Sequence, residues 1–325
     1  MTETAQHRTD RTNRNQRAWT TAGAGVAALA GAAVFNRWRS GAAEAAAPPR
    51  GDFVEVDGVR VHHVVEGSGS PVVLLHGNGV TLQDWELSGV LPAAAERFRT
   101  VAFDRPGFGY TDRPRATTWT PAAQADLLIR ACKKLGIGRP VVVGHSWGTL
   151  AALAMALDHP DDVAGLVLIS GYYFGTVRPD AALVSPVALP VLGDVLAHTV
   201  SPLTGRLLYP GAVKATFSPA PVDERFHAMR GLMMRPSQVR ADAADGALMV
   251  PAALALSKRY GDLKVPTHVL AGEGDRIVDI DGHAAKLADA APDATLRRFK
   301  NLGHMLHYAR PEAVVESIEA VARAA

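Results

Sequence analysis

The chain has 325 residues, of which 48% are hydrophobic and 20% are charged, and this composition is typical of a globular protein with a large core. The formal net charge is +2, from 34 Lys and Arg against 32 Asp and Glu, which argues against nucleic-acid binding as the main function. The single cysteine, Cys132, excludes an internal disulfide, and no Cys and His spacing is typical of a zinc site. We expect no metal and no nucleic-acid partner.

The first fifty residues form a separate piece. Residues 1–17 are a basic tail, and residues 18–36 carry no charge. Eighteen helical residues span about 27 Å, enough for a bilayer core, so the pattern predicts a membrane anchor or uncleaved signal. The arginines before it favour a cytoplasmic amino terminus and a folded part outside the cytoplasm. A cleaved signal peptide, giving a secreted protein, and an Ala-rich helix in water are the alternatives. Residues 37–51 predict a linker.

The folded part begins at Asp52 and alternates between strands and helices. Two alternating segments around Asp57-Gly58 predict a hairpin. Buried strands are expected at 72–75, 100–103, 140–143 and 165–169, and two further strands at 266–271 and 294–299. Helices are expected at 121–135, 147–158, 281–290 and 311–324. Together they predict an α/β fold with a mostly parallel, doubly wound sheet of about eight strands. Prolines in an insertion at about 172–262 allow only short helices there.

One short motif carries a nucleophile. Residues 144–148, Gly-His-Ser-Trp-Gly, follow an apolar strand and precede a helical stretch of small residues. This is the strand–turn–helix context of a nucleophile elbow. Side chains at Gly144 and Gly148 would clash with the neighbouring strand and helix, so the glycines let the Ser146 hydroxyl project from the carboxyl end of the sheet. The motif predicts Ser146 as a catalytic nucleophile.

Acyl transfer on a serine also needs backbone N–H donors for the oxyanion. The loop 76–79, His-Gly-Asn-Gly, follows the strand at 72–75. We expect the oxyanion hole to consist of the N–H groups of Asn78 and Trp147. His76 is expected to hold this loop rather than act as the base, because a better base lies downstream.

That base is His304, in the loop after the last strand, and a carboxylate must fix its tautomer. Asp275 is the expected acid because it follows the strand that ends at residue 271. Glu273 and Asp279 are nearby competitors for this role.

These motifs, with Asp104–Tyr110, give the chain a resemblance to the α/β-hydrolase fold serine hydrolases over residues 52–325. The resemblance implies the chain order Ser, Asp, His for the triad, a cap domain for the insertion from Tyr172, and a structural role for Asp104. Epoxide hydrolases and haloalkane dehalogenases have Asp where this chain has Ser146, which favours an acyl-enzyme. The esterase, lipase and haloperoxidase-like group fits best.

The sequence therefore predicts a cofactor-independent hydrolase that acts on a small-molecule carboxylic ester. The apolar insertion favours a substrate with a hydrophobic acyl or alcohol part. The expected pocket walls are Trp85, Tyr172, Tyr173, Phe174 and His307. The alternative for these five is that they pack the core. An acyltransferase with the same triad, and a non-catalytic ligand-binding protein on the same fold, remain the other interpretations.

Overall fold

The predicted α/β fold is confirmed. The computed structural model describes residues 3–176 and 185–325, with side chains from Trp19 onward. Its eight-stranded sheet has the order β1-β2-β4-β3-β5-β6-β7-β8, in which β2 pairs antiparallel with β1 and β4 and the other pairs are parallel. The strands are β1 (Asp52–Val56), β2 (Val59–Glu66), β3 (Pro71–Leu75), β4 (Arg99–Phe103), β5 (Val141–His145), β6 (Gly165–Ile169), β7 (Thr267–Gly272) and β8 (Ala294–Phe299).

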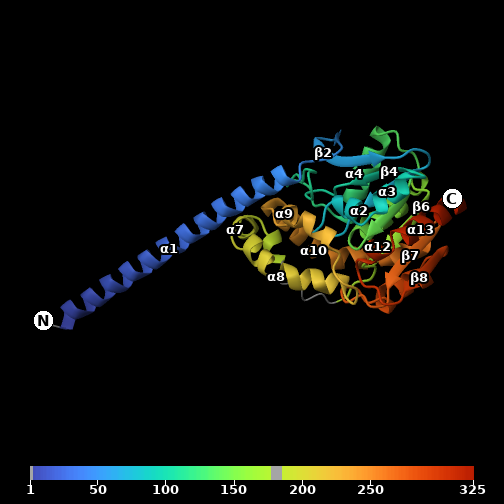
Figure 1. Ribbon diagram of the computed structural model, residues 1–325. Coiled ribbons are helices and arrows are strands. Elements are labelled where there is room, and N and C mark those ends of the chain that lie inside the picture. Colours follow the sequence, from blue (N-terminus) through green and yellow to red (C-terminus); the bar gives the residue numbers. More distant parts are fainter. Residues whose placement is uncertain (1–2, 177–184) are drawn as a thin grey trace.

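Helices cover both faces of this sheet (Figure 1). Successive strand residues point to opposite faces, so Val73 and Leu75 join one apolar core and Val72 and Leu74 join the other. The first core includes α4 (Pro121–Lys134), α5 (Gly148–Asp158) and α11 (Lys286–Ala290). The second includes α2 (Gln83–Leu87), α3 (Val90–Ala95), α12 (Leu306–Ala309) and α13 (Pro311–Ala324). Burial on both faces explains why these strands read as unbroken apolar runs.

The register of the parallel strands aligns their carboxyl ends. Leu75 lies opposite both Phe103 and Gly144, and His145 lies opposite Ile169. The segments that follow β3, β4 and β5 therefore meet at one edge of the sheet, which is where ligands bind in open α/β sheets.

A helical insertion separates β6 from β7 and forms the cap, of which residues 177–184 lie outside the described part. Its helices are η2 (Ser185–Ala188), α7 (Leu192–His198), α8 (Ser201–Phe217), η3 (Glu224–Met229), α9 (Arg230–Met233), α10 (Pro236–Leu256) and η4 (Ser257–Asp262). The expectation of only short helices was wrong, because α8 has 17 residues and α10 has 21. Pro202 and Pro236 lie in first turns, where a missing N–H costs little. Pro210 and Pro251 lie inside the helices, so tertiary packing outweighs their local effect.

The long helix α1 (Glu3–Ala46) precedes the sheet and extends away from the body beside the cap (Figure 1). It continues through residues 37–46, which the sequence predicted as part of a linker. Asn36 is buried against the cap, where its side-chain amide donates to the carbonyl oxygens of His198 and Thr199 at 3.0 and 2.8 Å. Arg206 donates to the Asn36 Oδ1 at 2.8 Å.

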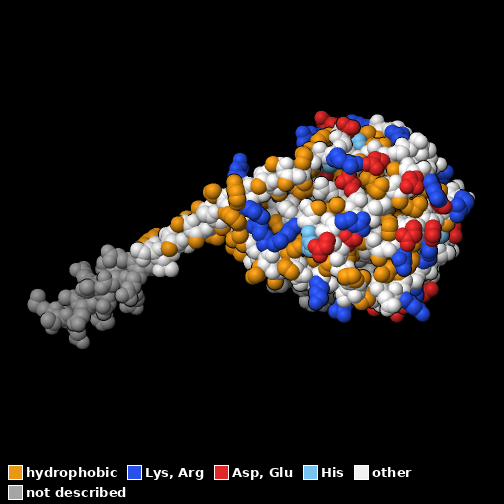
Figure 2. All heavy atoms as spheres, viewed as in Figure 1, with side chains coloured by type: hydrophobic (Ala, Val, Ile, Leu, Met, Phe, Trp, Pro, Cys, Tyr) orange, Lys and Arg blue, Asp and Glu red, His pale blue; other side chains and the backbone are white. Residues whose placement is uncertain are grey.

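The prediction of a membrane anchor at residues 18–36, with the membrane location drawn from it, was wrong. No helix in the described part of the chain is both long and apolar enough to cross a membrane. The segment consists mainly of Ala, Gly and Thr, whose side chains add little apolar surface, and its last residue, Asn36, packs on the cap. Hydrophobic side chains are still visible along the projecting part of α1 (Figure 2).

Candidate active site

Ser146 occupies a sharp turn between β5 and α5. Its φ of +50° lies in the left-handed region, which non-glycine residues adopt only where the surroundings impose it. The Ser146 N–H donates to the Ile169 oxygen at 2.9 Å, and the Ser146 oxygen accepts from the Thr149 hydroxyl at 2.6 Å. A Cβ on Gly148 would stand 2.3 Å from the Leu75 oxygen. The turn therefore depends on glycine there, as the elbow motif predicts.

His304 lies beside Asp275. The His304 Nδ1 is 2.8 Å from the Asp275 Oδ2, and both side chains are buried. The other oxygen of Asp275 accepts backbone N–H groups of Ile277 and Val278 at 2.7 and 3.0 Å, which fixes the carboxylate. Since a carboxylate only accepts, Nδ1 carries the proton and Nε2 is left as the basic nitrogen.

The two competing acids lie elsewhere. Glu273 is exposed, and Asp279 accepts the N–H of Gly282 at 2.5 Å, at the start of the π-helical turn Asp281–Ala285. Of the three candidates, the structure brings Asp275 to the histidine.

Arg105, whose side chain is completely buried, binds the loop after β3. The Arg105 guanidinium donates to the His76 oxygen at 2.9 Å, the Gly77 oxygen at 3.0 Å and the Asn78 Oδ1 at 3.2 Å. It also donates to the Gln124 Oε1 at 3.1 Å and forms an ion pair with Asp245 at 2.6 Å. Three consecutive loop residues are therefore fixed by one side chain.

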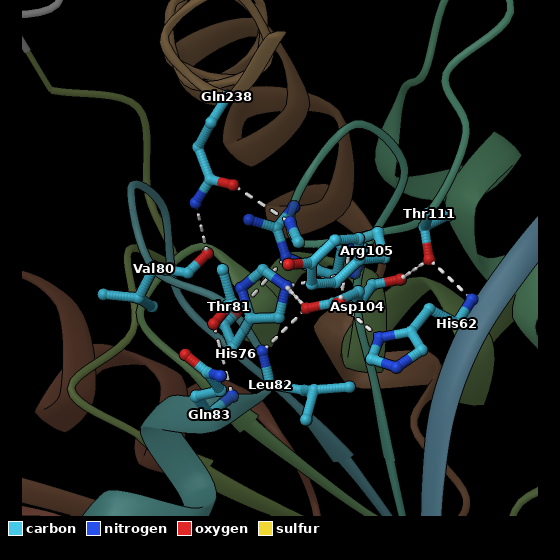
Figure 3. A network of polar contacts seen from close by, with 12 residues as sticks. His62, His76, Val80, Thr81, Leu82, Gln83, Asp104, Arg105, Thr111 and Gln238 are labelled. Atoms are coloured by element: carbon cyan, nitrogen blue, oxygen red, sulfur yellow. Dashed lines mark hydrogen bonds and ion pairs between the residues drawn. The ribbon is translucent and has the colours of Figure 1, made fainter. Parts of the chain in front are cut away.

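His76 and Asp104 extend this network. The His76 Nε2 accepts the Arg105 N–H at 3.0 Å, and burial and the charge of Arg105 lower the pKa of His76 to about 4, so the ring is neutral. Asp104 accepts from the Leu82 N–H at 2.8 Å and contacts the His62 Nδ1 at 2.6 Å (Figure 3). Burial opposes protonation of His62, but the bond to and charge of Asp104 outweigh it and raise the pKa of His62.

A cavity of about 510 Å³ lies between the carboxyl ends of the strands and the cap, and its wall includes Ser146, Trp147, Asn78 and His304. Most of the remaining wall is apolar, and its residues are Val80, Tyr172, Leu208, Tyr209, Ala212, Val213, Phe226, Met233, Met234, Met249, Ile277, Val278 and Met305. The expected nucleophile, base and oxyanion residues thus border one cavity.

Of the five expected pocket walls, Tyr172 alone borders this cavity. Tyr173 is completely buried, and its carbonyl oxygen accepts from the Tyr260 hydroxyl at 2.6 Å. Phe174 packs edge-on against the Tyr260 ring. Trp85 and His307 are both completely buried beneath the elbow, with ring centroids 5.4 Å apart. Trp85, Tyr173 and His307 are buried and Phe174 packs against the core, so none of these four borders the cavity.

A buried polar group lies beneath the elbow. Asp84, His145 and His307 bring potential metal ligands within 4.8 Å of one another. However, the two Asp84 oxygens accept from the His307 Nε2 and the Tyr308 hydroxyl, each at 3.0 Å. Burial, with His307 and His304 nearby, holds the pKa of His145 well below its usual value. The group is therefore partly hydrogen-bonded beneath Ser146, and the Nδ1 atoms of His145 and His307 have no hydrogen-bond partner among the described residues.

Sequence reasoning missed the contribution of α10. Its Gln238 side chain accepts the Gly109 N–H at 3.0 Å and donates to the Val80 oxygen at 3.1 Å (Figure 3). The backbone carbonyl oxygen of Asp242 accepts from the Asn78 side chain at 3.0 Å. The backbone carbonyl oxygen of Asp245 accepts from the Trp147 indole N–H at 2.9 Å. Polar residues at positions 238, 242 and 245 recur with helical spacing in an Ala-rich segment. That spacing was the available signal.

The comparisons with known proteins agree with this architecture. A sequence model of the alpha/beta hydrolase fold matches residues 70–311. The chain belongs to the alpha/beta hydrolase fold family. The resemblance drawn from the sequence motifs is thus confirmed at the level of the family.

Two relatives illustrate the range of this alpha/beta hydrolase family. The dihydrolipoyllysine-residue acetyltransferase component of the acetoin cleaving system of Cupriavidus necator is 30% identical over 262 residues, which cover 78% of this chain and 64% of that protein. The present chain therefore spans less than two thirds of that relative. The 2-hydroxy-6-oxo-6-phenylhexa-2,4-dienoate hydrolase of Burkholderia cepacia is 26% identical, over 78% of this chain and 88% of its own length.

Among solved structures, a thermophilic esterase from Thermogutta terrifontis superposes with a TM-score of 0.67 and 23% identity, over 83% of this chain and 96% of the esterase. At this identity the likeness shows the shared alpha/beta hydrolase fold.

The alpha/beta hydrolase has a second, larger cavity of about 790 Å³ between residues 107–119 and the cap. Its wall contains neither Ser146 nor His304. Arginines that line it are already paired, as Arg113 is with Asp245 at 2.8 Å. The smaller cavity is therefore the candidate active site.

Proposed function

We propose that this alpha/beta hydrolase cleaves carboxylic esters through an acyl-enzyme on Ser146. The observation that carries the proposal is the 2.8 Å contact between His304 and Asp275, with His304 and Ser146 bordering the same cavity. A histidine oriented by a carboxylate beside a serine is the arrangement that activates a hydroxyl nucleophile.

The chemistry follows from the positions of these groups. The Ser146 Oγ attacks the ester carbonyl carbon while the His304 Nε2 takes its proton, and Asp275 stabilises the imidazolium that forms. The backbone N–H groups of Asn78 and Trp147 stabilise the oxyanion. The C–O bond to the alcohol then breaks, and His304 gives the proton to the leaving oxygen. Water, deprotonated by the same nitrogen, attacks the acyl-enzyme and releases the acid.

The cavity supports a substrate with a hydrophobic acyl or alcohol part. Its wall is predominantly aliphatic, aromatic and methionine side chains, and burial of each CH₂ group from water contributes about 0.8 kcal/mol. A volume of about 510 Å³ is within the usual range for a small-molecule site. No cofactor takes part in the proposed reaction.

Acyl transfer to an acceptor other than water is the second candidate. It is favoured by the 30% identity with the acetyltransferase component from Cupriavidus necator. The same acyl-enzyme serves both reactions, so the nature of the second nucleophile separates them. Adding a primary alcohol or a thiol during turnover and measuring acylated product against free acid makes the distinction.

The proposal is tested with p-nitrophenyl esters of increasing acyl length and with Ser146→Ala. We expect this substitution to leave thermal unfolding unchanged and to lower kcat by at least about 10³-fold. Mass spectrometry of the wild-type protein after mixing should detect the acyl group on Ser146. Hydrolysis by the variant at the wild-type rate would refute the proposal.

The orienting acid is tested by a matched pair. Asp275→Asn should lower kcat by about 10³–10⁴-fold, because the neutral amide favours the wrong tautomer of His304. Glu273→Gln removes the same charge from an exposed position in the same loop and should leave kcat nearly unchanged. A reversal of the two effects would assign the role to Glu273.

A further inference from the structure

Asp242 is a carboxylate that the proposed reaction does not use. Among the described residues that border the catalytic cavity it is the only acidic one, and that wall contains no Lys or Arg. It lies on α10, on the side of the helix that faces the loop after β3.

The carboxylate lies close to the oxyanion residues. The Asp242 backbone oxygen accepts from the Asn78 side chain at 3.0 Å. The Asp242 Oδ1 is 3.7 Å from the point where a Cβ on Gly79 would stand. Asp242 is therefore a neighbour of both the loop backbone and the cavity, so that a molecule bound against Ser146 can reach it.

Within the described residues the Asp242 carboxylate makes no hydrogen bond or ion pair with a protein group. Arg105, the nearby cation, is bonded to Asp245 at 2.6 Å, and Arg113 also pairs with Asp245. Burial, together with the charge of Asp245, raises the pKa of Asp242 to about 6 and outweighs the opposing effect of Arg105. At pH 7.5 the group is ionised and lacks a counter-charge of its own.

We propose that the catalytic cavity takes esters that carry a cationic nitrogen, and that the Asp242 carboxylate binds this group. A partly desolvated carboxylate without a partner is unfavourable, and a bound cation compensates that cost. The same cation removes a repulsion, because an unpaired negative charge beside the oxyanion loop opposes the negative charge that develops on the carbonyl oxygen. The inference rests on the proposed function and names its substrate class.

The test compares two probes of the same shape. Choline and 3,3-dimethylbutan-1-ol differ in whether the trimethyl group is centred on a charged nitrogen or on a neutral carbon. Calorimetric titration of the full chain at pH 7.5 measures the binding of both without requiring turnover. We expect choline to bind at least about tenfold more tightly, because its trimethylammonium group, which has no N–H to donate, is attracted by the charge of the Asp242 carboxylate.

A matched pair of variants assigns the effect. Asp242→Asn keeps the side-chain shape and should abolish the preference for choline. Glu224→Gln removes the same charge at a side chain that is 90% exposed, outside the cavity wall, and should retain the preference. Equal binding of the two probes to the wild-type protein, no binding of choline, or a preference that survives in Asp242→Asn would each overturn the inference.

A measurement on the wild-type protein covers the case in which Asp242→Asn does not fold. With its pKa near 6, Asp242 is protonated below that value, so choline affinity should fall about tenfold between pH 7.5 and pH 5 while binding of the alcohol stays constant. The charged groups near it are Arg105, Arg113 and Asp245, and the histidines in the cavity wall are His145 and His304. Burial holds the pKa of His145 well below its usual value, so His304 is the histidine whose protonation could add repulsion. The fall in choline affinity should therefore persist in His304→Ala, and an affinity that is the same at pH 5 as at pH 7.5 would overturn the inference.

Failure of this inference and failure of the proposed function are distinguishable. Hydrolysis of p-nitrophenyl esters that depends on Ser146, with no preference for choline, would leave the function in place and remove the cation site.

Discussion

Replacing Arg105 with Met should destabilise the protein and slow its reaction together. The buried guanidinium forms an ion pair with Asp245 at 2.6 Å and donates to the backbone of the oxyanion loop at 2.9 and 3.0 Å. Loss of one partner of a buried pair costs about 3–5 kcal/mol. Arg113 still contacts Asp245 at 2.8 Å, so we expect the lower end, about 3 kcal/mol. For a chain of this size that corresponds to a fall in Tm of roughly 6 °C.

Kinetics separate the two effects. In the proposed mechanism the Asn78 N–H acts mainly on the transition state, so kcat should fall by about 10–100-fold with little change in KM. Urea unfolding followed by circular dichroism measures stability, and hydrolysis of a p-nitrophenyl ester measures kcat. Arg115→Met is the control, since Arg115 pairs with Asp194 at 2.8 Å while its side chain is 67% exposed. The control should leave both quantities unchanged. Equal effects of the two substitutions would refute the reasoning.

Two further predictions concern packing and pH. Gly148→Ala should destabilise the protein by about 1–3 kcal/mol or more, because its Cβ would stand 2.3 Å from a backbone oxygen. Gly211 lies in open space within α8, so Gly211→Ala should stabilise the protein by up to about 1 kcal/mol. The urea unfolding midpoints of the two variants check both predictions. The folded-state pKa of His62 lies above its unfolded value, so the stabilisation it contributes is complete below about pH 6.5 and is lost as pH rises through the folded pKa. Asp104→Asn should flatten that dependence in denaturant titrations from pH 6 to pH 8.5, and an unchanged slope would contradict the assignment.

The sheet and the elbow were predictable because their signals are local. Apolar runs mark strands that are buried on both faces, and each proposed catalytic residue follows the end of a strand. Parallel strands bring those ends together whatever the intervening chain does, so Ser146, Asp275 and His304 could be grouped without a structure. The glycines of the elbow are required by backbone contacts within the same short motif.

The cavity wall was not predictable in the same way. An aromatic residue after a strand can face the cavity, as Tyr172 does, or the core, as Tyr173 does, and one residue of register decides between them. Trp85 and His307 come from helices whose packing direction depends on the whole fold. Asp242 belongs to the cap, where no motif links it to the loop it borders.

The membrane anchor was predicted from the length of the segment, its absence of charge and the basic and Trp residues that flank it. Alanine and glycine satisfy the first two criteria but contribute little to partitioning, and alanine also favours a long helix that can lie against protein. Asn36, which is an ordinary polar residue in the sequence, fixes this helix to the cap together with Glu44, which pairs with Arg235 at 3.0 Å.

The contacts of α10 also bear on the evolution and engineering of this scaffold. A cap is an insertion between two strands, and in that sense it is a replaceable module. Here, however, Gln238 and Asp245 bind residues of the core sheet's loops, including the arginine that fixes the oxyanion backbone. A chimera that imports another cap would remove these supports along with the pocket wall. Grafts on this framework should therefore keep α10 and exchange the segment that precedes it, so that specificity can change while the reaction geometry is conserved.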